Sequence, residues 1–181
     1  MTQHRLDGIL SSDYLDGLGD HPTTELREMR AQCEAEERSV SYARRVLQGR
    51  LDILRAELLR RDGQGDREAG SLLSRLPDIL GHDHVATDPL HARATRLDVP
   101  PESADHEAKI DAIADEATLL SLPDRSGSQV EELVGRLTAL ESELSTIRRE
   151  LFDRIDRIRD ELAARYKDGR ASIGELLGTD R

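Results

Sequence analysis

Two long stretches of this chain carry the same heptad pattern of apolar residues, the second 104 positions after the first. A seven-residue spacing places apolar side chains along one side of an α-helix, as in a coiled coil. The repeat therefore predicts two equivalent long helices that bury a narrow apolar seam against each other, an all-α fold. The seam residues are Leu26, Cys33, Val40, Leu47 and Leu54, followed by Val130, Leu137, Leu144, Leu151 and Ile158.

A polar signature accompanies the seam at the same offset. At about 100° per residue, the five positions of each copy fall within about 80° of one another, directly beside the seam. The signature therefore predicts one polar stripe on each helix, next to the partner helix. The first copy is Glu37, Ser41, Arg44, Gln48 and Asp52, and the second is Glu141, Ser145, Arg148 and Asp156, with Phe152 at the position of Gln48.

The composition fits long helices and excludes several classes of function. Charged residues make up 35% of the chain and hydrophobic residues 36%, which suits a narrow seam better than a thick core. The net charge of −11 argues against general binding to DNA, RNA or anionic membranes, because phosphate contacts need a basic face. No apolar run approaches the ~18 residues of a membrane span, and the N-terminus does not resemble a signal peptide. With Cys33 as the only cysteine, we expect a cytoplasmic protein without an internal disulfide.

Helix-breaking and capping residues divide the chain into five segments. The first long helix is expected to begin near Pro22–Thr24, with a threonine cap, and to end at Gly63. Ser128 and Glu131 have the spacing of a capping box at the start of the second. The expected segments are an N-terminal arm over 1–21, a long helix over 22–62, a connector over 63–127, a long helix over 128–167 and a tail over 168–181.

The arm and the connector carry weaker signals. Apolar residues from Leu6 to Leu18 make the arm a docking segment, either onto this protein or onto a partner. Within the connector we expect short helices at 66–75 and 104–120, a single turn near 76–81, and a loop over 82–102. Four connector histidines lie among acids but without a fixed ligand spacing, so a metal site is disfavoured. They are His82, His84, His91 and His106.

The stripes allow two interpretations. Glu and Arg beside a heptad seam usually form salt bridges between helices, and exposed pairs contribute only about 0–1 kcal/mol. However, serine forms no ion pair, and aspartate is a poor helix former. Both recur at the same positions in the two copies, and packing explains neither. The alternative is a ligand site for a guanine nucleotide: carboxylates accept from the guanine donor edge, arginine binds O6 and N7, and hydroxyl or amide groups donate to phosphate.

The first copy reads E-x3-S-x2-R-x3-Q-x3-D, which resembles the cyclic di-GMP-binding motif of RsiG-type anti-sigma factors. The resemblance covers both long helices and implies an antiparallel hairpin with one motif on each helix. It implies that the two motifs bind two stacked molecules of cyclic di-GMP, and that the loaded protein sequesters a sigma factor of the WhiG-like (flagellar or sporulation) class. All stripe residues except Phe152 then become ligand contacts, and Phe152 is a departure from the motif.

The leading hypothesis is therefore a cyclic di-GMP-dependent anti-sigma factor without catalytic activity. The alternative is a structural coiled-coil adaptor whose stripe is only a set of salt bridges. An enzyme is disfavoured because the sequence offers neither an activated nucleophile nor a Gly-rich phosphate loop. Direct binding to DNA or to a membrane is not expected.

Overall fold

The computed structural model describes residues 2–63, 100 and 103–169 of the chain, and within these residues it contains helices and turns but no strand. This confirms the all-α prediction. The predicted helix at 66–75, the turn near 76–81, the 82–102 loop and the tail beyond Gly169 lie wholly or largely outside the described residues. The helices are α1 (Thr2–Leu10), α2 (Thr23–Arg61), α4 (Ala104–Ala114), α5 (Glu116–Leu120), the 3-10 helix η2 (Leu122–Asp124) and α6 (Gly127–Lys167).

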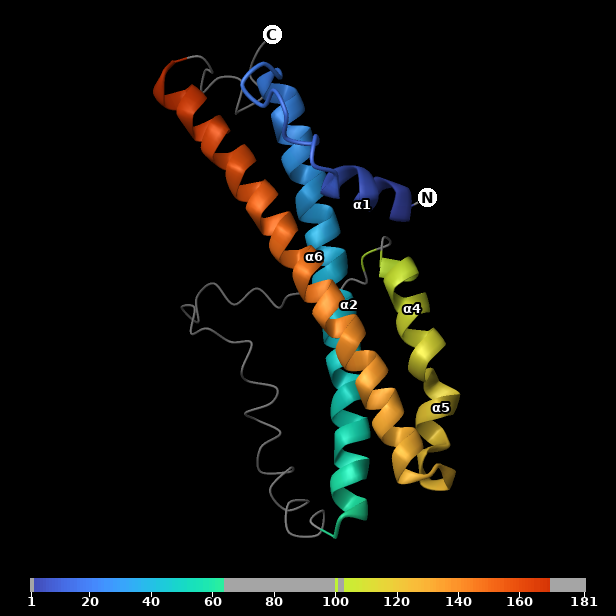
Figure 1. Cartoon of the computed structure of the whole chain (residues 1–181). Coiled ribbons are helices and arrows are strands. Elements are labelled where there is room, and N and C mark those ends of the chain that lie inside the picture. Colours follow the sequence, from blue (N-terminus) through green and yellow to red (C-terminus); the bar gives the residue numbers. More distant parts are fainter. Residues whose placement is uncertain (1, 64–99, 101–102, 170–181) are drawn as a thin grey trace, which may run out of the picture.

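The two long helices, α2 and α6, form an antiparallel pair that crosses near the middle of each helix (Figure 1). They contain 39 and 41 residues, which corresponds to about 60 Å each at 1.5 Å per residue. Arg27, near the start of α2, donates to the hydroxyl of Tyr166, near the end of α6. Arg61, at the end of α2, contacts the turn that precedes α6. The predicted hairpin is therefore confirmed.

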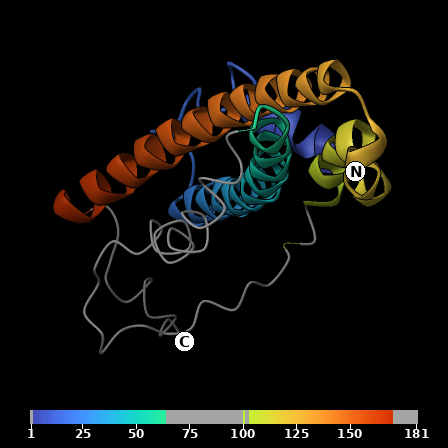
Figure 2. The ribbon, with the colours of Figure 1, turned by 90° about the horizontal axis from the view of Figure 1, so that it is seen from below.

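The predicted seam is the core of this pair. None of its ten heptad residues is more than 1% exposed, Cys33 included. Burying a leucine side chain contributes about 1.5–3 kcal/mol, so a seam of this length stabilises the pair substantially. α4 and α5 lie along the half of the hairpin where α6 begins (Figure 2).

The helix ends differ in detail from the predictions. The capping box of α6 is formed by Ser126 and Gln129, not by Ser128 and Glu131: the Ser126 hydroxyl accepts from the Gln129 amide at 3.2 Å. Two serines two positions apart made either register possible, and glutamine serves as well as glutamate in such a box. α2 is preceded by Pro22 without any side-chain cap, so the predicted threonine cap was wrong.

A glycine lies two residues beyond the end of each long helix, as predicted for the first. Gly63 and Gly169 have φ angles of +70° and +69°. This left-handed conformation is one that residues with a Cβ rarely adopt.

The helix expected over 104–120 is broken in two. Asp115 is extended, with ψ at 177°, and its carboxylate accepts from the amide of Thr118 at 2.8 Å. An aspartate that caps a new helix competes with continuation of the old one, and the weak apolar periodicity did not reveal this competition. The stop at Leu122-Pro123 is η2.

The N-terminal arm docks onto this protein, which decides between the two alternatives left open by the sequence. Its first half is α1, where Leu6 is 7% and Ile9 is 2% exposed. The turns at residues 11–21 add the half-buried Tyr14, Leu15 and Leu18, which pack against the same core.

Two arginines of α6 hold this arm through its backbone. The Arg154 guanidinium donates to the carbonyl oxygens of Ile9 and Leu10, both at 2.7 Å, in the last turn of α1. A cation at a helix C-terminus satisfies carbonyls that have no partner within the helix. Arg165 is only 6% exposed and binds the turn that follows α1. It donates at 2.6–3.0 Å to the carbonyl oxygens of Leu18, Gly19 and His21.

Two arginines of α2 hold α4 and η2 in the same way. Arg50 donates at 2.6 Å to the carbonyl oxygen of Ala114, the last residue of α4. Arg61 donates at 2.6 Å to the carbonyl oxygens of Leu122 and Arg125. Arg50 stands 104 positions before Arg154, and Arg61 stands 104 before Arg165.

The residues whose carbonyl oxygens accept from these arginines are also 104 positions apart. Leu10, Leu18 and His21 correspond to Ala114, Leu122 and Arg125. The repeat therefore includes α1 and α4 as well as the long helices, and the described structure has an approximate twofold axis. α1 and α4 are each fastened to the long helix of the other repeat, whereas α5 and η2 correspond to turns in the first repeat.

His106 in α4 is expected to make the packing of this helix sensitive to acid. The side chain is buried, and its Nδ1 atom has no hydrogen-bond partner. Burial, with the charge of Lys109, lowers its pKa below the usual 6.5, while Asp105 and Glu143 act in the opposite direction. Because the unfolded state then binds more protons, stability is lost as the pH falls below about 6.5.

The measurement is the urea midpoint of the wild type and of His106→Leu at pH 7.5 and pH 5.5. The wild type is expected to lose more stability on acidification than the variant does. The difference between the two proteins removes the contribution of the other titrating groups. Equal losses would contradict a buried neutral imidazole.

Candidate functional site

The two stripes face each other at the crossing of α2 and α6. Arg44 of α2 donates to Glu141 of α6, with its Nε and a terminal nitrogen 3.2 and 2.7 Å from the same carboxylate oxygen. Arg148 of α6 donates through Nε to Glu37 of α2 at 3.0 Å. The two pairs are related by the 104-residue offset, so they lie on opposite sides of the twofold axis.

The two serines complete this network. Ser41 donates to Glu37 at 2.5 Å, and Ser145 donates to Glu141 at 3.0 Å. Ser41 also accepts from Arg148 Nε at 2.9 Å. Each serine thus orients the glutamate four residues earlier, the spacing at which helical side chains meet.

Arg44 is the main reason that Glu141 is held in its ionised form. Its hydrogen bond lowers the pKa of the Glu141 carboxyl, against the opposing effect of desolvation, and Ser145 and Gln48 lower it further. The side chains of Arg44 and Glu141 are 20% and 24% exposed, so solvent reaches both. The network is therefore charged, oriented and accessible.

The remaining stripe residues lie farther from the axis and are open to solvent. Gln48, Asp52, Phe152 and Asp156 are all exposed. Asp156 pairs with Arg159 at 2.9 Å, and its counterpart Asp52 lies 4.0 Å from Arg55. The structure thus brings together six of the nine predicted residues in a central network, with Gln48 at its edge and the two aspartates at the two ends.

Phe152 does not join the seam. Its side chain is 40% exposed, and the guanidinium carbon of Arg148 lies 4.8 Å from the ring centroid. At this distance a cation–π contact steadies the guanidinium. The aromatic ring therefore remains part of the accessible stripe surface, in the place where the first copy has Gln48.

Several charged residues that organise the surroundings were missed in the sequence. Glu36 is only 1% exposed and pairs with Arg5 of α1 at 2.6 Å. Arg50, Arg61, Arg154 and Arg165, described above, were missed as well. The sequence does carry a signal for the four arginines, because Arg50 recurs as Arg154 and the pair Glu57 and Arg61 recurs as Glu161 and Arg165. Glu36 has no such counterpart, since Leu140 occupies the equivalent position.

Within residues 2–63 and 103–169, no group of three His, Cys, Asp or Glu side chains could hold a metal ion. His82, His84 and His91 lie outside these residues. None of the described helices is both long and apolar enough to cross a membrane.

A comparison with curated proteins found no match. The family model described as RsiG-like matches residues 12–80, which include the whole of α2 and the first stripe. It agrees with the resemblance inferred from the motif, and it shows that residues 12–80 are similar to the RsiG-like family.

Proposed function

We propose that the chain is a cyclic di-GMP-dependent anti-sigma factor that sequesters a sigma factor of the WhiG-like class. The observation that carries the ligand assignment is the pairing of the two stripes across the axis, Arg44 with Glu141 and Arg148 with Glu37. Cyclic di-GMP is itself twofold symmetric, and a symmetric ligand suits a self-complementary site.

The same side chains can exchange their present partners for the ligand. In place of a glutamate, each arginine would bind guanine O6 and N7 or a phosphate oxygen. The freed carboxylates of Glu37 and Glu141 would accept from the guanine N1–H and N2–H₂ groups. The ligand thus replaces charge-assisted hydrogen bonds with others of the same kind, and the carboxylates do not remain unpaired.

Charge sets a requirement on this exchange. Each cyclic di-GMP carries two negative charges, and the protein already has a net charge of −11. Arg44 and Arg148 offset the repulsion at the centre of the stripe. Arg55 and Arg159, each beside an aspartate of the stripe, are placed to offset it at the two ends.

The sigma factor is proposed to use the acidic surface of the hairpin. A sigma factor contacts DNA through a basic face, which an acidic protein attracts, and covering that face blocks promoter binding. If ligand tightens the complex, linkage requires that sigma tightens ligand binding by the same factor.

The test is a pull-down of a purified WhiG-like sigma factor with and without cyclic di-GMP at moderate salt. Recovery that depends on the ligand is the expected result. Equal recovery in both lanes would contradict the proposal that cyclic di-GMP controls sigma binding. No recovery in either lane would contradict the anti-sigma assignment.

A structural adaptor without a ligand is the second candidate. It is favoured by one observation: the central stripe residues already satisfy one another across the helices in this structure. The two candidates differ in whether cyclic di-GMP binds.

A further inference from the structure

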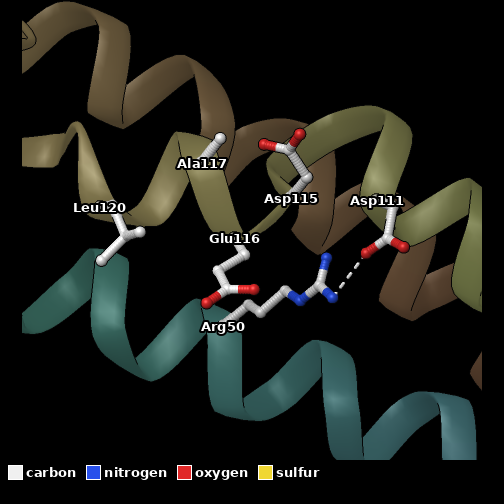
Figure 3. Close-up of a pocket in the computed structure, with 6 residues that line it drawn as sticks. All are labelled: Arg50, Asp111, Asp115, Glu116, Ala117 and Leu120. Atoms are coloured by element: carbon white, nitrogen blue, oxygen red, sulfur yellow. Dashed lines mark ion pairs between the residues drawn. The ribbon is translucent and has the colours of Figure 1, made fainter.

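A cleft of about 540 Å³ lies between α2 and the α4–α5 segment, away from the stripes (Figure 3). It carries three carboxylates and one guanidinium, so its local charge is negative. The lining residues are Arg50, Asp111, Asp115, Glu116, Ala117 and Leu120.

The polar groups of this cleft divide into two sets. Arg50 is occupied, because it binds Asp111 at 2.6 Å and the Ala114 carbonyl oxygen at 2.6 Å. One carboxylate oxygen of Asp115 accepts from the Thr118 amide and so caps α5, and this hydrogen bond lowers the pKa of Asp115. Asp115 and Glu116 are both exposed and adjacent, and neither forms a salt bridge in the part of the chain that the structure describes. The charge of Arg50 acts on Asp115 but is shared with Asp111, to which Arg50 is bound.

The internal repeat supplies a second cleft for comparison, of about 220 Å³, between α6 and the turn after α1. Its Arg154, Ser11 and Ser12 stand 104 positions from Arg50, Asp115 and Glu116. The two clefts are therefore equivalent positions of one scaffold with different chemistry. The second cleft is lined by Ser11, Ser12, Leu15, Asp153, Arg154 and Arg157.

The difference extends to two exposed apolar side chains. Leu120 is 75% exposed, and its counterpart in the other repeat is Asp16. Ile53 is 49% exposed, and its counterpart is Arg157, which lines the second cleft. Ile53 lies on α2 three residues after Arg50, although it is not among the residues that line the first cleft.

Folding explains only part of this difference. Asp115 caps α5, whereas the equivalent residues of the other repeat form turns. The other repeat forms the same arginine anchor and the same long helix with Arg157 at the position of Ile53, so neither of these needs an apolar residue there. Leu120 leaves apolar surface exposed beside the carboxylates of Asp115 and Glu116, and apolar surface rimmed by polar residues is a feature of interaction sites.

We propose that this cleft docks a basic amphipathic segment of the protein partner, which rests on the proposed function in that the partner is the sigma factor. A lysine or arginine of that segment pairs with Asp115 and Glu116. An apolar residue one helical turn away covers Leu120 and Ile53. Only one side of the twofold structure would then bind the partner, since the second cleft has neither the adjacent carboxylates nor the exposed apolar side chains.

The experiment replaces the cleft residues with those of the other repeat: Asp115→Ser, Glu116→Ser and Leu120→Asp together. Serine also caps a helix, and aspartate occupies the equivalent exposed position, so the fold is expected to persist. The control is Ser11→Ala with Ser12→Ala in the second cleft. Sigma affinity, cyclic di-GMP affinity without sigma, and thermal unfolding are measured for each protein.

The triple variant is expected to lose at least about tenfold in sigma affinity and to show a weaker salt dependence, because two charged contacts are lost. Its ligand affinity and melting temperature should match the wild type, and the control should match in all three measurements. Unchanged sigma affinity would overturn the cleft assignment and leave the anti-sigma function intact.

Two further outcomes would also overturn the assignment. If the wild type captures no sigma factor, the anti-sigma function fails, and the docking proposal fails with it. If sedimentation shows a dimer of the wild type that the triple variant loses, the cleft is occupied by a second copy of this chain.

Discussion

Arg44→Ala is expected to weaken cyclic di-GMP binding roughly ten- to hundred-fold, as loss of one bidentate contact removes about 1–3 kcal/mol. Helix content should hardly change, because alanine is the better helix former. The lost pair with Glu141 is partly exposed, and such pairs contribute little to stability. The measurements are a calorimetric titration with ligand and a circular dichroism spectrum.

The matched control is Arg149→Ala, which removes an exposed arginine directly after the stripe residue Arg148. Affinity within about twofold of the wild type is expected there. The stripe would be structural if Arg44→Ala left affinity unchanged, or if the helices melted in that variant.

Leu47→Ala is expected to lower the free energy of unfolding by about 2–5 kcal/mol, the range for a buried leucine that leaves a cavity. Leu47 is fully buried in the seam between α2 and α6. The measurement is urea unfolding followed by circular dichroism. Leu120→Ala is the control, and at 75% exposure it should change stability by less than about 0.5 kcal/mol.

A loss for Leu47→Ala no larger than that of Leu120→Ala would contradict the seam as the main source of stability. A large loss for Leu120→Ala would instead show that the α4–α5 segment contributes more to folding than its exposure indicates.

The hairpin was predictable because its cause is periodic. Seam residues recur every seven positions, and each of them is buried as the pattern indicates. The stripe was predictable for the same reason, since its angular position beside the seam fixes which residues meet across the axis. The seam and the stripe each occur twice in the sequence, so the prediction made from one copy was supported by the other.

The anchoring of the short helices was predictable only in part, because the recurrence of Arg50 and Arg61 as Arg154 and Arg165 marks the arginines but not their partners. Arg154 and Arg165 bind backbone carbonyl oxygens, which every residue carries. The side chains of the arm therefore do not indicate which residues these arginines bind. Likewise, Ser126 and Ser128 offered two possible caps, and the structure uses Ser126. The break at Asp115 came from one local hydrogen bond.

The central network satisfies both interpretations of the stripe. Salt bridges between helices and a ligand site require the same residues to meet, and Arg44, Glu141, Arg148 and Glu37 do meet. The recurring serines now have one structural role, since each donates to a glutamate of its own helix. The exposed Asp52 and Asp156 have no partner on the opposite long helix among the described salt bridges, which is where a ligand would add contacts.

A calorimetric titration of the full chain with cyclic di-GMP, with cyclic di-AMP and GTP as controls, tests directly whether the stripes form a guanine-nucleotide site. We expect saturable binding of about two cyclic di-GMP molecules per chain and no comparable binding of either control. Absence of cyclic di-GMP binding, or equal binding of cyclic di-AMP, would contradict a guanine site and leave the stripe as a set of salt bridges.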